Sequence, residues 1–379
     1  MSVSLKQRVA RNLFNIRGWK TKRKIVVLES DDWGSIRMPS KDVYDKLLAS
    51  GIEVNKCSYC KYDSLETEKD LNLLFDVLLS CKTGSGQNPV ITGNTIVANP
   101  DFEKIKESDY KEYYFENSVK TFERFPDCKN SFNLWKKGIT ENIFHPQLHG
   151  REHLNVNRWM RYLQEGSKET LYAFENNMFG ISTNVSKENR RSYMAALDFE
   201  DEKELAQQKE ILKDAQNIFQ SYFGYNSLSF IAPNHTWSSK LEPVLSDIGV
   251  KYLQGARFQV IPHSEKAENK NKKHYTGESN STNQYYLVRN SFFEPALMSS
   301  NFDSVNNCLH QIDVSFRWNK PAIISTHRLN YMGSIVEQNR TQNLSLLKKL
   351  LTSIIKKWPD VEFFTSDKLG ELIADKSQK

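Results

Sequence analysis

Two short segments of the chain hold the residue types that a catalytic metal site needs. Asp31 and Asp32 follow closely after an apolar run, Ile25–Leu28, and three histidines fall within residues 145–153. Two histidines and one aspartate bind a catalytic divalent cation and leave coordination positions open for water. The second aspartate then remains available as a base. We expect a three-ligand site for Zn²⁺, with Co²⁺, Ni²⁺ or Mn²⁺ as alternatives.

The spacing of the three histidines favours one pair of ligands. His149 and His153 are four residues apart, so a helical turn would place both side chains on one face. His145 and His149 have the same spacing, but Pro146 disfavours a helix through His145, because the residue before a proline avoids helical backbone angles. We therefore expect His149 and His153 as ligands, and His145 as their substitute or as a residue on the substrate side.

Alternating strand and helix patterns must position these residues. Apolar runs predict strands, and apolar residues at helical spacing predict helices. The expected strands are 25–28, 89–98, 143–144, 228–231, 252–253, 285–288, 322–325 and 361–364. The expected helices are 40–50, 65–79, 130–137, 202–222, 242–247, 305–316, 344–358 and 368–373. This alternation implies a parallel sheet, open or closed. We expect an α/β fold, a distorted (β/α) barrel of about seven parallel strands with loop and helical insertions.

The length of 379 residues suits one barrel of this kind. We expect residues 24–375 to form a single domain with its active site at the carboxyl ends of the strands. A helical insertion is expected near 155–199. A second insertion, near 263–284, is rich in Ser, Asn, Lys and Glu, and we expect it to be an exposed loop.

The positive charge of the chain is concentrated at its N-terminus. The net charge is +6, yet residues 1–24 contain eight Lys or Arg residues and no acidic residue. A nucleic-acid-binding protein would carry a basic face on the folded domain, so we exclude that class. Apolar residues recur within residues 1–23 at helical spacing: Leu5, Val9, Leu13 and Ile16. This segment therefore predicts a basic amphipathic helix, either packed on the barrel or lying on an anionic membrane surface.

Several patterns bear on the location of the protein. No apolar run is long enough to span a bilayer, and we find no secretory signal. The five cysteines are scattered, and Cys57 and Cys60 form a CxxC without a second pair at zinc-ribbon spacing. We expect reduced thiols and a cytoplasmic protein, with peripheral contact at the inner face of the membrane through residues 1–23.

With these motifs the chain resembles the polysaccharide deacetylase family, the NodB-homology carbohydrate esterases. That family has an Asp-Asp pair after its first strand and a later His-x-x-x-His, which Asp31-Asp32 and residues 149–153 match. Residues 324–327, Ile-Ser-Thr-His, match its Leu-x-His at the end of a late strand. The resemblance runs from about Lys24 to Ile373.

The resemblance implies a metal-dependent hydrolase that removes an acyl group, N-acetyl first, from a sugar or polysaccharide during surface glycan biosynthesis or modification. It implies that Asp32, His149 and His153 hold the metal and that Asp31 is the catalytic base. His327 would protonate the departing amine or alcohol.

Further polar and aromatic residues are candidates for contacts with the sugar. The segment 234–237, Asn-His-Thr-Trp, resembles a substrate-facing loop. The expected substrate-binding residues are Trp33, Arg37, His145, Arg151, Asn234, His235 and Arg328.

The chain also departs from the family pattern, which indicates a divergent member. The family has an Arg-x-Pro-Tyr whose arginine orients the base, whereas residues 231–234 are Ile-Ala-Pro-Asn. We expect Arg37, Arg151 or Arg328 to supply that charge. The family's fourth motif, with an aspartate and a tryptophan, has no match, and Gly255-Ala-Arg257 occupies its region.

Two other classes of protein remain open. A glycoside hydrolase on a related barrel needs two carboxylates that flank a glycosidic bond, and Asp31 with Glu152 is a conceivable pair. This alternative leaves the histidines unexplained. A catalytically inactive glycan-binding module is the second alternative. The motif departures favour it, while Asp31 and His327 are arguments against it.

The expected location of the protein limits the class of sugar that it could meet as a substrate. Most members of the family act on exported polymers, but this chain shows no export signal. We therefore expect a nucleotide-linked or lipid-linked sugar, and the basic segment 1–23 favours the lipid-linked form. The oligomeric state is not predicted.

Overall fold

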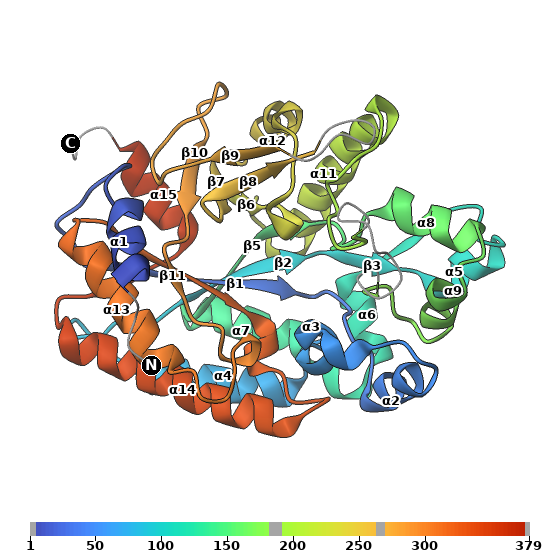
Figure 1. Ribbon diagram of the computed structural model, residues 1–379, viewed down its shortest axis with the longest axis horizontal. Coiled ribbons are helices and arrows are strands. Elements are labelled where there is room, and N and C mark those ends of the chain that lie inside the picture. Colours follow the sequence, from blue (N-terminus) through green and yellow to red (C-terminus); the bar gives the residue numbers. More distant parts are fainter. Residues whose placement is uncertain (1–4, 182–191, 263–269, 376–379) are drawn as a thin grey trace.

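A curled parallel sheet forms the centre of the molecule (Figure 1). The computed structural model describes residues 5–181, 192–262 and 270–375. Within these residues, nine strands form the main sheet in the order β10-β7-β6-β5-β2-β1-β12-β11, with β13 paired to β1, and every pair is parallel. The strands are β1 (Ile25–Trp33), β2 (Ile91–Ile96), β5 (Phe144–Gly150), β6 (Ser229–Ile231), β7 (Tyr252–Gly255), β10 (Tyr285–Val288), β11 (Ser291–Phe292), β12 (Ala322–His327) and β13 (Glu362–Phe364).

The two ends of this sheet belong to one stretch of chain. β10 pairs with β7, and β11 pairs with β12, so only Arg289 and Asn290 separate the two edges. The backbone N–H of Arg289 donates to the carbonyl of Gly255, and that of Asn290 donates to the carbonyl of Ile323. The sheet therefore curls into a distorted (β/α) barrel, as the sequence predicts. The split between β10 and β11 is one reason why the strand number exceeds seven.

β1 runs through the middle of the sheet and delivers the Asp-Asp pair. All nine of its residues are buried, as is usual for a strand of a parallel sheet that is covered on both faces. Its register with β12 places Asp31 opposite His327. Two sequence motifs that lie almost 300 residues apart thus become neighbours at the carboxyl ends of adjacent strands.

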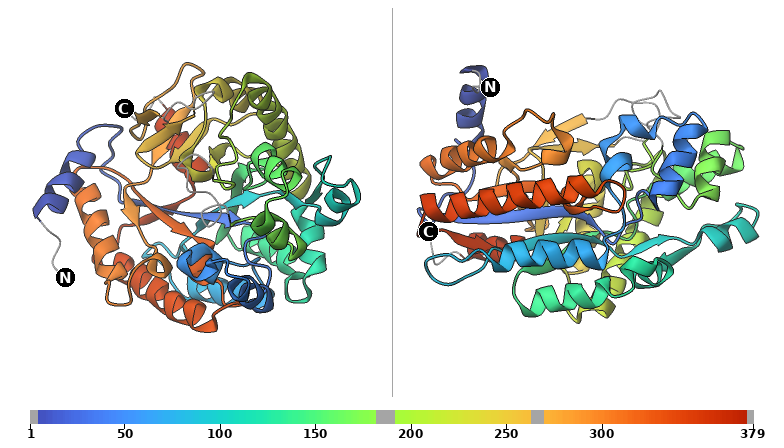
Figure 2. Two further views of the ribbon diagram at one scale, coloured as in Figure 1. Left: turned by 45° about the vertical axis from the view of Figure 1, so that its right-hand side comes forward. Right: turned by 90° about the horizontal axis from the view of Figure 1, so that it is seen from below.

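Helices surround the sheet (Figure 2). Most periodic segments of the sequence form helices close to their predicted bounds. Ser40, at the N-cap of α2 (Lys41–Ala49), accepts a hydrogen bond from the Val43 N–H at 3.1 Å. α4, α7, α13 and α14 pack over one side of the barrel on a common apolar core that includes Trp33 and Phe144. The helices predicted from the sequence are α2 (Lys41–Ala49), α4 (Glu68–Leu79), α7 (Ser131–Thr140), α11 (Glu202–Phe223), α12 (Glu242–Asp247), α13 (Ser304–Arg317), α14 (Glu337–Lys357) and α15 (Ser366–Ala374).

Additional short elements gather near the carboxyl ends of the strands. The predicted insertion near 155–199 contributes α8 (Val156–Gln164) and α9 (Lys168–Glu175), and residues 182–191 lie outside the described part. Together with α2, these helices pack on a second apolar core around Trp159. The elements without a sequence prediction are α3 (Ser58–Tyr62), α5 (Phe102–Glu107), α6 (Ser118–Arg124) and a two-stranded sheet of β3 (Ala98–Pro100) and β4 (Phe115–Asn117).

The second predicted insertion, 263–284, is not simply a loop. β9 (Lys270–Lys273) pairs antiparallel with β8 (Phe258–Ile261), and His274 is buried behind this hairpin. Residues 263–269 lie outside the described part. The four residues of β9, Lys-Asn-Lys-Lys, are all exposed, so this strand gives no apolar signal that sequence analysis could detect.

The basic N-terminal segment forms α1 (Leu5–Phe14), which lies on the outside of α13 (Figure 2). Nη1 of Arg11 lies 3.0 Å from Nδ1 of His310, and the indole N–H of Trp318 donates to Asn12. Leu13 and Val9, in contrast, are 57% and 50% exposed. Within the described residues, no helix has the length and apolarity needed to cross a membrane.

Candidate metal centre

Asp32 lies at the carboxyl end of β1, in a backbone conformation that turns its side chain away from that of Asp31. Its φ angle is +78°, in the left-handed region where aspartate is among the few side chains tolerated. The pairing of β1 with β2 is also irregular here, between Ser30 and Trp33. The two neighbouring carboxylates therefore face different side chains: Asp32 faces the two histidines, and Asp31 faces an arginine.

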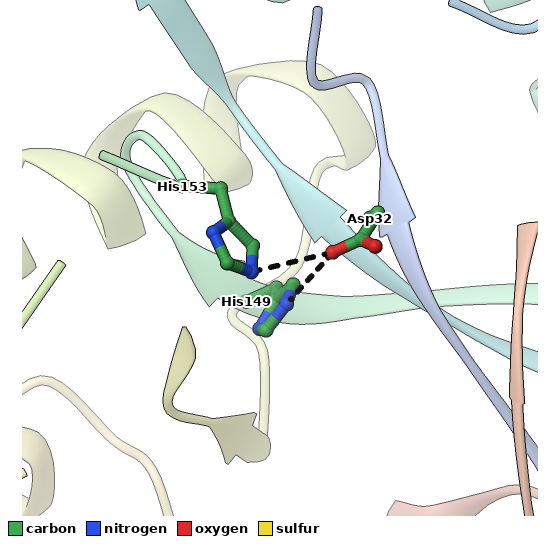
Figure 3. A group of neighbouring side chains, drawn as sticks. All are labelled: Asp32, His149 and His153. Atoms are coloured by element: carbon green, nitrogen blue, oxygen red, sulfur yellow. Dashed lines mark ion pairs between the residues drawn. The ribbon is translucent and has the colours of Figure 1, made fainter. Parts of the chain in front are cut away.

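His149 and His153 point toward Asp32 (Figure 3). Their Nε2 atoms each lie 3.4 Å from Oδ1 of Asp32. His149 is in β5 and His153 is in the loop that follows, so the helical turn expected from their spacing is wrong. The strand end and its loop bring the two imidazoles together instead, with ring centroids 5.0 Å apart. Asp32, His149 and His153 are all buried.

These distances fit a divalent cation held by all three side chains. Zn²⁺ binds His nitrogen at about 2.0–2.1 Å and carboxylate oxygen at about 2.0–2.2 Å, so neighbouring ligand atoms of a tetrahedral site are roughly 3.4 Å apart. At this separation, Asp32 and the imidazoles are too far apart for a good direct hydrogen bond. The Nδ1–H of His149 donates to the carbonyl of Ile231 at 2.8 Å, which leaves the lone pair of Nε2 directed at Asp32.

The electrostatics of the three groups also suit a metal. Desolvation by burial lowers the pKa of His153 to about 3, so the imidazole is neutral at pH 7 and its nitrogen is free to coordinate. Burial opposes ionisation of Asp32, but its attraction to the neighbouring histidines holds the pKa of its carboxyl well below the usual value. The group is therefore a carboxylate with two histidines, a donor set that binds zinc and similar divalent ions.

Asp31 is fixed by an arginine that the sequence did not point to. Arg289 donates two parallel hydrogen bonds to its carboxylate, at 2.6 Å to Oδ1 and 2.7 Å to Oδ2, and Asn94 donates to Oδ1 at 2.7 Å. A third donor of Arg289 reaches Glu29 at 2.6 Å. Burial alone would raise the pKa of Asp31, but Arg289 outweighs it and holds the pKa far below the usual value.

The expectation that Arg37, Arg151 or Arg328 orients Asp31 is thus wrong. Arg289 comes from the point where the chain passes from β10 to β11, not from the loop after β6 that carries the family's Arg-x-Pro-Tyr. A signal was present, since Arg289 directly follows a predicted apolar strand, Tyr285–Val288. Only the closure of the barrel brings that strand end to β1.

His327, at the end of β12, forms the opposite side of the site. Its Nδ1 lies 2.6 Å from Oε1 of Glu294, and its Nε2 lies 3.5 Å from Oδ2 of Asp31 and 3.3 Å from the hydroxyl of Tyr59. Burial disfavours the charged ring, but Glu294, with Asp31 and Asp32, raises the pKa of His327 to about 10. The imidazole is therefore protonated at neutral pH and carries a proton that it could donate.

These groups line a pocket of about 340 Å³. Of the predicted substrate-binding residues, the structure brings Arg37, Asn234 and His235 to its wall. Asn234 and His235 have φ angles of +54° and +52°, which mark a tight turn after β6. The pocket is lined by Asp31, Asp32, Arg37, Cys57, Tyr59, His149, His153, Ser192, Met194, Ala232, Asn234, His235 and His327.

Two of the other predicted substrate contacts are buried among their own partners and do not line this pocket. Trp33 is completely buried and packs edge-on against Phe144 in the core. Arg328 is also completely buried, and its guanidinium pairs with Asp63 and Glu66. Neither side chain has free surface for a sugar, so the prediction that these two residues bind substrate needs correction.

The remaining candidates for sugar contacts do not line the pocket either. Arg151 pairs with Glu152 and Asp214. Ring nitrogen Nε2 of His145 lies 3.0 Å from Asp367, so His145 is neither a ligand nor a pocket residue. Trp237 is buried in the core that α11 covers. We therefore do not retain these side chains as contacts with substrate.

Fold and site together define a (β/α) barrel with a buried Asp-His-His group that could hold a metal at the carboxyl ends of its strands. No protein-family model and no curated sequence matches the chain. Among solved structures, a probable polysaccharide deacetylase from Pseudomonas aeruginosa PAO1 aligns over 92% of this chain and 91% of its own, with a TM-score of 0.46 and 9% identity. The Puue allantoinase aligns over 93% and 91% (TM-score 0.45, 10% identity), and the α-amylase AmyC from Thermotoga maritima over 92% and 74% (TM-score 0.46, 9% identity). Because these scores are below 0.5, the functional argument rests on the site itself.

Proposed function

We propose that the chain is a divergent member of the polysaccharide deacetylase family, a metal-dependent hydrolase that removes an acyl group, N-acetyl first, from a sugar. One observation carries the proposal: the two adjacent aspartates contact different side chains. Asp32 lies 3.4 Å from two histidine nitrogens, while Asp31 is held by Arg289 and faces His327. This division matches what the hydrolysis of an amide or ester needs.

In this proposal Asp32, His149 and His153 hold the divalent ion, with Zn²⁺ as the first candidate. When bound, the ion supplies Lewis-acid polarisation of the acyl carbonyl and acidifies a water molecule. The remaining chemistry belongs to the side chains. Asp31 stays ionised because of Arg289, and a carboxylate has about four lone-pair positions, so donors already present do not exhaust its capacity to accept a proton from water.

His327 completes the reaction on the leaving-group side. Departure of an amine or alcohol requires a proton, and the imidazolium of His327 holds one at neutral pH because Glu294 and Asp31 stabilise its charge. Its Nε2 faces the pocket between Asp31 and Tyr59, which is where the leaving atom must receive the proton. In this proposal the base, Asp31, and the acid, His327, are therefore two separate side chains.

The glycoside hydrolase alternative loses its support. It relied on Asp31 acting with Glu152, but Glu152 is buried against Arg151 and Tyr113 and does not line the pocket. The inactive glycan-binding alternative was motivated by the missing arginine. Arg289 supplies that charge by another route, which favours an active enzyme.

Contact with a membrane remains part of the proposal. α1 presents Val9 and Leu13 to solvent, and Ile16, two residues beyond the end of the helix, is exposed as well. These apolar side chains lie beside basic residues, which suits the surface of an anionic bilayer. A lipid-linked sugar at the inner face of the membrane, in surface glycan biosynthesis, would meet such a protein.

Two variants test the proposed function by separating metal binding from turnover. We expect Asp32→Asn to lose both the bound divalent ion and acyl release from N-acetylated sugars. Asp31→Asn should retain the ion and lose activity by about 100-fold or more, the contribution of a general base. Metal content is measured on the purified protein, and acetate is measured directly. Equal acetate release by Asp31→Asn and the native chain would overturn the assignment of the base.

A further inference from the structure

Arg37 differs from the buried arginines of this protein because it forms no ion pair with an acidic side chain of the described residues. In the part of the chain that the structure describes, each of the five arginines that are buried forms an ion pair with at least one carboxylate. They are Arg151, Arg158, Arg289, Arg328 and Arg340. Arg37 is partly buried, and none of the ion pairs of the described residues includes it. Its Nε atom is buried without a hydrogen-bond partner.

The side chain of Arg37 is nevertheless held in place. Its guanidinium lies over the ring of Tyr59, 5.2 Å from the ring centre. A Cβ atom at position 180 would come within 3.3 Å of its Nε, so Gly180 leaves the space that the guanidinium occupies. Cys57 lines the same pocket, and its pKa is lowered first by a hydrogen bond from Cys60 and then, against the effect of burial, by the charge of Arg37. These contacts fix the position of the cation. The charges of Asp32 and Asp63 raise its pKa, but neither carboxylate forms an ion pair with it.

Arg37 is also the single lysine or arginine among the described residues that line the catalytic pocket. The other charges of the pocket are already matched. Asp31 is paired with Arg289, His327 with Glu294, and Asp32 faces the metal ligands. An anionic ligand entering the pocket would therefore find in Arg37 a cation that forms no ion pair with a carboxylate of the described residues.

Leaving a desolvated guanidinium unpaired is costly, and the cost disappears when an anion binds. Arginine presents a planar set of donors that matches the oxygens of a carboxylate or a phosphate, often through two parallel hydrogen bonds. Such a contact fixes orientation as well as affinity. A fixed arginine in the pocket wall would hold one end of a sugar while the acyl group lies at the metal ligands.

We propose that the substrate is an anionic acylated sugar whose carboxylate or phosphate group binds Arg37. This inference rests on the proposed function for the reaction, but the binding of the anion is a separate property. A uronic acid would provide a carboxylate, and a nucleotide-linked or lipid-linked sugar would provide a phosphate. Both sources share an oxyanion attached to the sugar that carries the acyl group.

The test compares the binding of three related sugars to the metal-loaded chain by calorimetry. N-acetylglucosamine is neutral, its 1-phosphate carries a phosphate, and N-acetylglucosaminuronic acid carries a carboxylate. We expect at least one anionic sugar to bind 10-fold or more tightly than the neutral sugar. The anionic sugar that binds more tightly shows whether Arg37 binds a phosphate or a carboxylate. Equal binding of all three sugars by the native chain would overturn the inference.

Variants distinguish Arg37 from the metal, which also attracts anions. Arg37→Gln should remove the preference for the anionic sugar and leave the affinity for the neutral sugar within 2-fold. Arg37→Lys should keep part of the preference for the anionic sugar, which would also show that the pocket is intact. Arg317→Gln, on the exposed surface of α13, serves as the matched control and should change nothing. A preference that persists in Arg37→Gln would contradict the inference.

Failure of the inference and failure of the proposed function give different results. If Arg37 has no part in binding, metal content and acetate release still follow the Asp31 and Asp32 variants. If the protein is not a deacetylase, no acetate is released from any sugar, yet binding of the anionic sugar still depends on Arg37.

Discussion

Arg289 donates two parallel hydrogen bonds, of 2.6 and 2.7 Å, to the carboxylate of Asp31, which lies 258 residues away in the sequence. The same guanidinium binds Glu29, which lies two residues earlier on β1. Arg289 lies between β10 and β11, the two edge strands of the sheet. Its side chain therefore connects β1, which carries the proposed base, to the segment that closes the barrel. The geometry of the proposed base and the closure of the fold depend on the same residue.

Conservative replacement of this arginine should separate positioning from charge. Arg289→Lys keeps a positive charge near Asp31 but cannot form the two parallel hydrogen bonds. We expect kcat to fall by about 100-fold, the effect of a misplaced reacting group, while metal content stays at the native level. Steady-state kinetics and metal analysis check this together. Native kcat in Arg289→Lys would mean that Asp31 needs no such orientation.

The acid form of His327 should depend on Glu294. Because the pKa of His327 is raised to about 10, the ring is protonated at neutral pH, and the proton is lost as pH rises through that value. Glu294→Gln removes the nearest negative charge, lowers this pKa and should move the alkaline fall in kcat/KM to lower pH. Profiles of kcat/KM against pH for both proteins measure the shift. An unchanged alkaline limb would contradict the assignment of His327 as the acid.

Much of this site could be predicted from the sequence, because its parts are short and lie at strand ends. The apolar run before Asp31 and the strand before His327 are buried on both sides, so both strands and both residues were found. His149 and His153 were also paired correctly, although a strand end and loop place them rather than a helix. The long amphipathic helices, such as α11 and α14, followed from periodicity.

What the sequence did not reveal depends on contacts between distant segments. Arg289 reaches Asp31 only because the edge strands β10 and β11 meet and close the barrel, and no local sequence pattern encodes that closure. Trp33 lies next to Asp32, yet its side chain turns into the core, where the irregular pairing of β1 with β2 ends. Arg328 likewise follows His327 but is enclosed by Asp63 and Glu66.

Removal of the metal should weaken the fold as well as the activity. A ligand that binds only the folded state stabilises it by about 2.7 kcal/mol at a free concentration 100 times its Kd. We therefore expect a chelator to lower the Tm of the native chain and to leave the Tm of Asp32→Asn unchanged. Thermal unfolding followed by circular dichroism measures both. A native Tm that does not respond to chelator would argue against a bound ion.

The exposed face of α1 should mediate binding to anionic membranes. Val9 and Leu13 of α1 are 50% and 57% exposed, and Ile16, just after the helix, is 43% exposed. Replacing all three with Ser removes apolar area without touching the contacts of Arg11. We expect co-sedimentation with vesicles that contain anionic lipid to fall several-fold in this variant.

A matched control replaces exposed apolar residues elsewhere. Leu48 and Leu73, which lie on α2 and α4, are 40% and 37% exposed, and their replacement with Ser should leave vesicle binding unchanged. If the native chain stays in the supernatant with anionic vesicles, α1 has no membrane role and serves only to cover α13.

The position of the metal ion is the most direct test of the account. Crystals of the zinc-loaded protein, measured on both sides of the zinc absorption edge, locate the ion by its anomalous scattering. The account predicts one strong peak about 2.0–2.2 Å from an Oδ atom of Asp32 and from Nε2 of both His149 and His153. The carboxylate of Asp31 should lie outside this coordination and remain on Arg289. A peak elsewhere, or none among these three side chains at full zinc loading, would contradict the proposed metal centre.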